Sequence, residues 1–356
     1  MNALKQIERQ LSESVAARAH DDATGLLGAP ATTQRPLLRR RPVQFALAGV
    51  LGAALLVVGL TNLGGAPGAT PAAAAALERL ARIAGSGPSL VPGPGEYLYV
   101  RSVSDYPAVI EGGRGQTPCV SYAVDHRQVW IAADGSGLLR ESTGPTTFPS
   151  AADQEHCQAV APKLASASGT SNLWFAAGCF ELGPTNDMGS LSTDPGTLLE
   201  QMRRLDGGPD TPGEDFVHVG DFLRETDASP ELRAALYRAA ALIPGVQLLG
   251  TVQDHFGRHG LGVALTTDGV RHELIFNGQT AALMGEQSTG STPESNSWAV
   301  YLNSSVVDNQ PYPSPVRLNP PCNAGAGHVQ NVPGGSVETG LPAGQADGFA
   351  PQPANP

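Results

Sequence analysis

The hydrophobic and polar positions of the chain change character near residue 43, near residue 96 and again near residue 311. Residues 43–60 are apolar except for Gln44, and no charged side chain occurs between Pro42 and Leu77. At about 1.5 Å per residue, a helix over this apolar run spans about 27 Å, which is enough for the hydrocarbon core of a bilayer. The pattern therefore predicts a transmembrane helix over residues 43–63.

Beyond this segment, residues 96–310 carry the strand and helix patterns of one folded domain. Residues 97–103 alternate in polarity, and a three-strand meander follows at residues 261–285, with tight turns at Asp268-Gly269 and Asn277-Gly278. The further expected strands cover residues 128–133, 138–142, 246–254 and 298–307. The expected helices begin at Pro195 and Pro230, with a third around residues 216–223. We therefore expect an α+β domain in which an antiparallel sheet packs against helices.

The segments on either side of the span and the end of the chain have their own patterns. In the arm of residues 1–42, apolar side chains at helical spacing predict a short amphipathic helix, which would bind a partner or lie on the membrane: Leu4, Ile7, Leu11 and Val15. Residues 64–95 place a helix-forming run between two Gly- and Pro-rich runs, which predicts a juxtamembrane helix and linker. Residues 311–356 are rich in Pro and Gly without an apolar stripe, which predicts a disordered tail.

Charge predicts the orientation of the span. The chain carries a net charge of −11, of which residues 1–42 contribute +3 and the remainder −14. Cytoplasmic loops carry the excess of Lys and Arg, so we expect a single-pass protein of the cell membrane with its N-terminus in the cytoplasm and its C-terminal domain outside. A cleaved signal peptide is the alternative, but the apolar run is long and about 42 residues precede it. The acidic balance argues against nucleic acid as a partner.

The four cysteines all follow the span, in a compartment where disulfides persist. We expect one bridge within the set Cys119, Cys157 and Cys179, with the choice of partners open, because Cys322 belongs to the tail. Free thiols without a function are the alternative. None of the four has the spacing of a zinc ribbon or a thioredoxin-type motif.

The densest group of residues able to carry chemistry is Asp254, His255 and His259, followed by His272-Glu273 one strand later. Such a set could supply metal ligands or an acid–base pair. Residues 254–260 have the composition of an exposed turn, which favours solvated histidines instead. The sequence also lacks a His-Glu-x-x-His motif, a Gly-x-Ser-x-Gly elbow, a P-loop and a dinucleotide fingerprint. We therefore assign no catalytic residue, no metal and no cofactor.

The chain resembles a group of uncharacterised actinobacterial single-pass membrane proteins that are often encoded beside extracytoplasmic-function sigma factors. The segments that carry the resemblance are Tyr97–Arg101, Thr193–Pro195, Ser229–Val246, Asp254–Arg258, Leu274–Phe276 and Asn303–Asp308. The group has no assigned activity, so the resemblance implies no catalytic residue.

The order of strands and helices is also similar to the open half-barrels of lipoprotein carriers and periplasmic sigma-regulatory proteins. This likeness implies a curved sheet that cradles an apolar ligand around helices, with Val270, Leu274 and Phe276 as the lining. The expected function is thus a membrane-anchored extracytoplasmic binding or sensory protein linked to sigma-factor regulation, without catalytic activity. The expected partners are the lipid bilayer, a cytoplasmic regulatory protein bound through residues 1–42 and an apolar ligand. The alternatives are a structural or interaction protein of the envelope and, last, a hydrolase.

Overall fold

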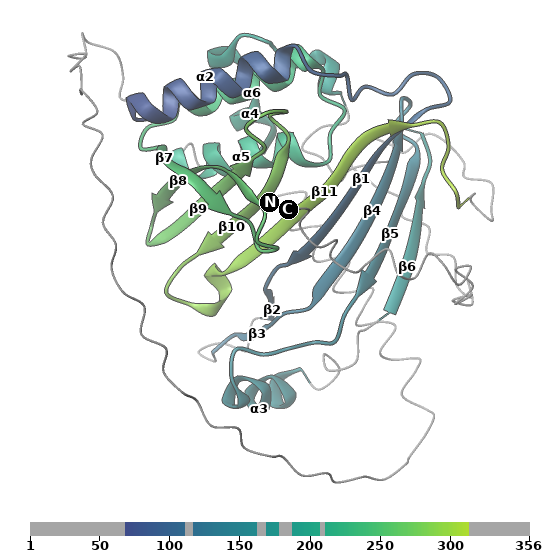
Figure 1. Ribbon diagram of the computed structural model, residues 1–356. Helices are drawn as coiled ribbons and strands as arrows, with labels where there is room; N and C mark the ends of the chain where they lie inside the picture. Colours follow the sequence, from purple (N-terminus) through teal and green to yellow (C-terminus); the bar gives the residue numbers. More distant parts are fainter. Residues whose placement is uncertain (1–67, 111–116, 162–168, 178–186, 207–210, 313–356) are drawn as a thin grey trace, which may run out of the picture.

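The computed structural model describes residues 68–110, 117–161, 169–177, 187–206 and 211–312 (Figure 1). The predicted cytoplasmic arm of residues 1–42, the predicted span of residues 43–63 and all but the first two residues of the predicted tail lie outside these ranges. Among the helices within them, none has both the length and the apolar character that a bilayer crossing requires.

Among the described residues, nine strands form one antiparallel sheet in which β11 occupies the centre (Figure 1). In sheet order they are β6 (Gly169–Phe175), β5 (Gly137–Thr143), β4 (Val124–Ala132), β1 (Tyr97–Asp105), β11 (Ser297–Val307), β10 (Leu283–Thr289), β9 (Val270–Phe276), β8 (His259–Thr267) and β7 (Gln247–Gln253). β1 pairs with β11 from Trp298 to Val307, with one irregularity at Leu302, whereas β10 pairs only with Ser297–Val300. The two halves of the sheet therefore separate beyond Val300, and Figure 1 shows the sheet twisted and curved about β11.

Local turn chemistry explains where the strands of the meander end. Asp268 and Gly269 both have positive φ angles, 51° and 79°, as the two central residues of a type I′ hairpin turn require. This predicted tight turn is confirmed. The tight turn predicted at Asn277-Gly278 is wrong, because the Asn277 carboxamide accepts hydrogen bonds from the backbone N–H groups of Gln279 and Thr280. The chain forms a wider loop there, and β10 begins only at Leu283.

Four helices cover the β7–β10 half of the sheet on one face (Figure 1). They are α2 (Pro71–Gly85), α4 (Pro195–Asp206), α5 (Pro212–Arg224) and α6 (Pro230–Leu242). The predicted start of α6 is confirmed, since the Ser229 hydroxyl accepts a hydrogen bond from the Leu232 N–H as an N-cap. A short 3₁₀ turn, Met188–Ser190, precedes α4, and another, Pro293–Ser295, precedes β11.

The helix expected in the juxtamembrane linker is α2, and it lies in the core of the domain. Leu77 and Leu80 are buried within the same apolar cluster as the α6 residues Leu236 and Tyr237. An ion pair between Glu78 and Arg238 joins the exposed sides of α2 and α6. The position of α2 depends on this packing, which the Gly- and Pro-rich flanks of the segment do not reveal.

A second apolar cluster lies on the other half of the sheet, on the face that the helices also occupy. Its members come from five strands and include Leu98, Val100, Val129, Leu139, Leu173 and Phe175. Ala299 belongs to this cluster and lies in register with Glu286 and then Leu274, a member of the helix-covered cluster. Residues directly opposite one another in neighbouring strands share a face, so the two clusters lie on one continuous surface of the sheet.

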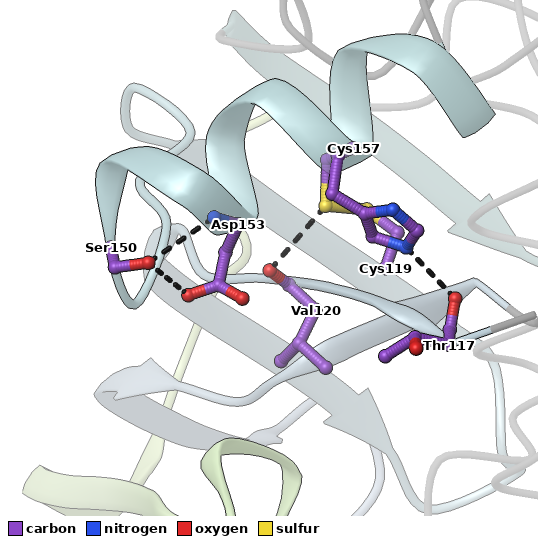
Figure 2. Close-up of a disulfide and its surroundings, with 7 residues drawn as sticks. Thr117, Cys119, Val120, Ser150, Asp153 and Cys157 are labelled. Atoms are coloured by element: carbon purple, nitrogen blue, oxygen red, sulfur yellow. Dashed lines mark hydrogen bonds between the residues drawn. A yellow bond between two sulfur atoms is a disulfide. The ribbon is translucent and has the colours of Figure 1, made fainter.

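A two-stranded ribbon and a helix, neither of them predicted from the sequence, lie beyond the end of β1. They are the ribbon of β2 (Ala108–Ile110) and β3 (Cys119–Ser121), and the helix α3 (Ala151–Val160). A disulfide joins Cys119 of β3 to Cys157 of α3, and Ser150 caps the helix (Figure 2). The bridge expected within Cys119, Cys157 and Cys179 therefore joins the first two, whereas Cys179 lies outside the described residues.

Candidate functional site

The turn between β7 and β8 is built around Asp254. Its buried carboxylate accepts hydrogen bonds from the backbone N–H groups of Phe256 and Arg258, each at 2.9 Å, and from the Arg258 guanidinium at 2.6 Å. Gly257 has a φ of 78°, which favours glycine at that position. The side chain of Asp254 is thus committed to shaping the turn.

Arg258 links this turn to the centre of the sheet. Its guanidinium donates to the carbonyl oxygens of Met284 at 2.8 Å and Tyr301 at 3.0 Å. Met284 precedes Gly285 and Tyr301 follows Val300, so both residues lie just beyond the last pair of the β10–β11 ladder. Arg258 therefore satisfies carbonyls that lose their strand partner where the two halves of the sheet separate.

The same turn presents His255 and Phe256 outward. The His255 ring stacks on the Trp298 indole with 3.7 Å between ring centroids and 3° between planes. The Phe256 ring lies 6.1 Å from the same indole and is 41% exposed. A large exposed aromatic side chain beside a stacked pair is a feature of binding surfaces.

A hollow of about 340 Å³ opens beside the His255–Trp298 pair. Its lining is Asp105, Tyr122, Thr147, His255, Gln287, Ser288, Thr289, Asn296, Ser297 and Trp298. Trp298 stands in register between Asp105 of β1 and Gln287 of β10, so these three side chains share a face of the sheet. The lining therefore combines polar side chains with the stacked rings of His255 and Trp298.

Asp105 is the only carboxylate in this lining. One of its carboxylate oxygens is buried and has no hydrogen-bond partner, and burial raises the pKa of this carboxyl group above its usual range. A buried acceptor without a partner costs free energy unless a donor reaches it. A bound hydroxyl or amide could supply that donor.

Of the polar candidates from the sequence, only His255 lines the hollow. Asp254 is buried in its own turn, and the exposed His259, at the start of β8, lies 3.3 Å from the Gln253 side-chain nitrogen. Within the described ranges, no three His, Cys, Asp or Glu side chains gather closely enough to hold a metal ion. The arrangement at His255 therefore suits hydrogen bonding and stacking.

The apolar candidates lie elsewhere, in the core beneath the helices. Phe276 is fully buried and meets the Tyr237 ring of α6 edge-on, with centroids 5.2 Å apart. Leu274 lies against Gly220 of α5, where an added Cβ would approach its side chain to 3.1 Å. Val270, at the start of β9, is half-buried. Helix side chains fill the space over Leu274 and Phe276.

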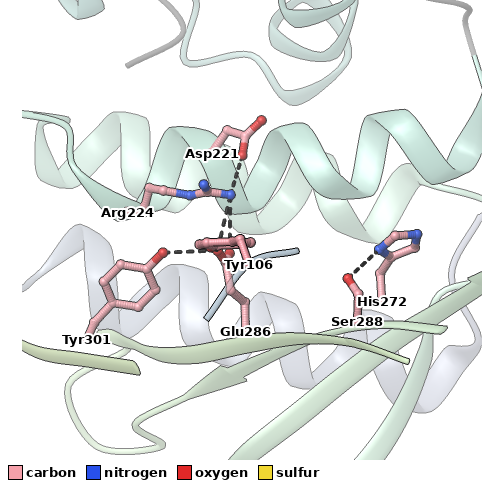
Figure 3. A network of polar contacts seen from close by, with 7 residues as sticks. All are labelled: Tyr106, Asp221, Arg224, His272, Glu286, Ser288 and Tyr301. Carbon is pink, nitrogen blue, oxygen red and sulfur yellow. Dashed lines mark hydrogen bonds and ion pairs between the residues drawn. The ribbon is translucent and has the colours of Figure 1, made fainter. Parts of the chain in front are cut away.

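A network of charged and phenolic side chains, most of them half-buried, occupies the helix side of the sheet near β10 and β11. Figure 3 shows Arg224 of α5 reaching Asp221 and Glu286, while the hydroxyls of Tyr106 and Tyr301 donate to Glu286 at 2.6 and 3.1 Å. In the same figure His272 lies 3.0 Å from the Ser288 hydroxyl, and burial lowers the pKa of this histidine.

The residue that directly follows α5 extends this network to the other half of the sheet. Glu225 pairs with Arg127 of β4 at 3.1 Å, and Glu141 of β5 lies 3.9 Å from the same guanidinium. Burial raises the pKa values of Glu225 and Glu141, and Arg127 opposes the rise. The network thus joins the end of α5 to both halves of the curved sheet.

Sequence reasoning missed most of these residues, because they come from elements distant in the chain. Trp298 could have been singled out, since an aromatic side chain in a strand either packs in the sheet or lines a groove. Asp105, Thr147 and Asn296 stand at strand ends or in loops without any periodic signal. Strand register places Asp105, an isolated bridge to Tyr122 places Thr147, and the 3₁₀ turn before β11 places Asn296.

Comparison with known proteins adds weak structural likenesses. No protein-family model matches the chain, and no curated protein matches it. The Pseudomonas aeruginosa MucA/MucB complex contains a similar chain, with 12% identity, 66% of this chain and 57% of that chain covered, and a TM-score of 0.25. MucB in complex with MucA(peri) gives 9% identity, 66% and 56% coverage and a TM-score of 0.23. The chain spans little more than half the length of these matched chains, and TM-scores this low carry no inference about a ligand or a partner.

Proposed function

We propose that the chain is a membrane-anchored extracytoplasmic protein that binds a small polar ligand in a sensory role, without catalytic activity. The location is supported by the apolar run of residues 43–60, the arginines before it and the Cys119–Cys157 disulfide, since disulfides persist outside the cytoplasm. The binding role is supported by the hollow beside the stacked His255 and Trp298 rings.

The chemistry of the hollow selects the ligand class. Its volume of about 340 Å³ is at the lower end of the range for small-molecule sites. The Gln287 amide can exchange hydrogen bonds with neutral groups, and Asp105 accepts one from a donor. The Asn296 amide and the Thr147 hydroxyl already bond to backbone groups of the protein and help to shape the rim. The aromatic pair offers a flat apolar surface to C–H groups. We therefore propose an uncharged ring bearing hydroxyl groups, such as one sugar unit.

Titration of the full-length chain in nanodiscs with N-acetylglucosamine tests this proposal. The readout is tryptophan fluorescence, because Trp298 lines the hollow. We expect saturable binding in the wild type, at least tenfold weaker binding in His255→Ala, and unchanged binding in His259→Ala. His259 is the matched control, since it is also exposed and does not line the hollow. Absence of saturable binding would contradict the proposal and favour a structural or interaction role in the envelope.

The predicted topology is tested separately. Protease added to intact cells should remove an epitope fused to the C-terminus and leave one fused to the N-terminus. Survival of the C-terminal epitope would overturn the proposed orientation.

We further propose that the arm of residues 1–42 contacts a cytoplasmic regulatory protein, such as a component of sigma-factor control. The support is the apolar spacing of Leu4, Ile7, Leu11 and Val15, together with the family resemblance. A pull-down with residues 1–42 as bait should recover a specific protein. Recovery of nothing beyond a scrambled peptide of the same composition would count against this role for the arm.

A further inference from the structure

A row of three aromatic side chains and one leucine crosses four neighbouring strands on the face of the sheet opposite the helices. Tyr99 of β1 pairs in register with Trp130 of β4, which pairs with Leu138 of β5, which pairs with Trp174 of β6. These residues alternate along their strands with buried members of the second apolar cluster, so they point away from it. The Tyr99 and Trp130 rings pack with 5.0 Å between centroids.

Tyr312, the fifth residue after β11, lies against this row. The backbone carbonyl of Tyr312 accepts a hydrogen bond of 2.8 Å from the Trp174 indole N–H. The Tyr312 ring meets Trp130 edge-on at 5.9 Å, and the Arg140 guanidinium lies 4.6 Å from the centre of the same ring. One residue therefore makes a hydrogen bond, an aromatic contact and a cation–π contact with side chains from three strands.

Only a few residues separate the end of β11 from the contact between Tyr312 and Trp174. β11 ends at Val307, and five residues extend at most about 17 Å to Tyr312. From β11 to β6 the path crosses four strand spacings of about 4.8 Å, or about 19 Å. Tyr312 reaches the Trp174 indole because that side chain extends from β6 toward it, and the intervening backbone bends at Asp308 and Pro311.

The sequence around Tyr312 is typical of a proline-rich ligand. It reads Gln310-Pro311-Tyr312-Pro313-Ser314-Pro315, with proline at every second position. A residue before proline is restricted to extended or polyproline II backbone, so little conformational entropy is lost when such a segment docks. Aromatic rows with an exposed N–H donor are the surfaces that proline-rich segments recognise.

We propose that Tyr99, Trp130, Arg140 and Trp174 form a binding surface for a proline-rich segment, and that the start of the same chain's own proline-rich tail, at Pro311 and Tyr312, occupies it. The tail segment is thereby an intramolecular strap across the outer face of the sheet. A proline-rich segment of a second protein binds the same surface only by displacing it.

Two measurements on the full-length chain in nanodiscs test this proposal, both in a Trp298→Phe background so that Trp130 and Trp174 supply the fluorescence. In the first, Tyr312→Ala should increase quenching of the tryptophans by acrylamide. Tyr312→Phe keeps the ring and the carbonyl and should match the parent. Equal quenching in all three proteins would overturn the proposal.

In the second measurement, a synthetic peptide of residues 309–318 is titrated into the parent and into Tyr312→Ala. The tethered tail has an effective concentration of about 1 mM, so the peptide should bind the parent at least about tenfold more weakly than the variant. Adding Trp174→Phe to the Tyr312→Ala variant removes the indole N–H donor and should lower the affinity for the peptide. Equal affinity for parent and variant, or no saturable binding to the variant, would overturn the proposal.

Discussion

Replacing Cys119 and Cys157 together with serine removes the disulfide that ties α3 to β3, the only disulfide among the described residues. The bridge closes a loop of 38 residues. In the chain-entropy treatment, ΔS ≈ −2.1 − 1.5R ln 38, or about −13 cal/mol/K. At 25 °C this corresponds to about 4 kcal/mol of stability lost through the unfolded state.

In the folded state, few contacts other than the disulfide hold α3 against the rest of the domain. Cys157 is the only buried residue of α3, and the other nine residues of the helix are exposed or half-buried. The remaining contacts include a 2.8 Å hydrogen-bonding contact between the His156 ring and the Thr117 carbonyl (Figure 2). We therefore expect α3 to detach locally in the double variant, while the sheet and the other helices persist.

Thermal unfolding of the full-length chain, followed by near-ultraviolet circular dichroism, measures the first effect. For domains of 150–250 residues, about 4 kcal/mol lowers the Tm by roughly 8–16 °C. Hydrogen exchange measures the second, with fast exchange expected for α3 and protection retained in α6. Reducing the wild type should reproduce the shift, and reductant should not affect the double variant. A Tm within 2 °C of the wild type, with α3 still protected, would refute this reasoning.

Burial and charge set the effects of substitutions at Leu77 and Glu225. Leu77→Ala should lower the free energy of unfolding by about 3 kcal/mol, because Leu77 is fully buried between α2 and the core. Leu242→Ala, at a residue that is 48% exposed, should change it by less than about 0.5 kcal/mol. Equal effects of the two substitutions in denaturation curves would place α2 outside the core. Burial raises the pKa of Glu225 above its ordinary value of 4.5, so the folded state binds the extra proton and stability falls as pH rises from 4.5 through the raised pKa. Glu225→Gln removes that loss, so the Tm of the variant relative to the wild type should increase with pH, and parallel Tm curves would contradict the raised pKa.

Elements with strong local signals could be predicted from the sequence. Ser229 before Pro230 starts α6, and Asp268-Gly269 closes the β8–β9 hairpin, because a cap and a type I′ turn depend on adjacent residues alone. The same reasoning failed at Asn277, where the side chain captured two backbone N–H groups and widened the loop. A dipeptide motif does not show which hydrogen bonds its side chain will make.

The candidate site was harder to predict, for a related reason. Asp254 and His255 are neighbours, but the turn buries the first against Arg258 and exposes the second to Trp298. Arg258, the partner of Asp254, stands at the far end of the turn, whereas Trp298, the partner of His255, belongs to β11. Their different roles could not be read from composition or spacing.

The sequence by itself determined the expected topology, the α+β class and most strands and helices, because apolar runs, charge balance, caps and turns are properties of neighbouring residues. Only the tertiary structure decided which residues meet. Strand register set Trp298 between Asp105 and Gln287, the packing of α2 against α6 drew an expected linker into the core, and the path of the chain after β11 set Tyr312 against Trp174. Such contacts join positions far apart in the chain, so their chemistry arises only once the sheet has assembled.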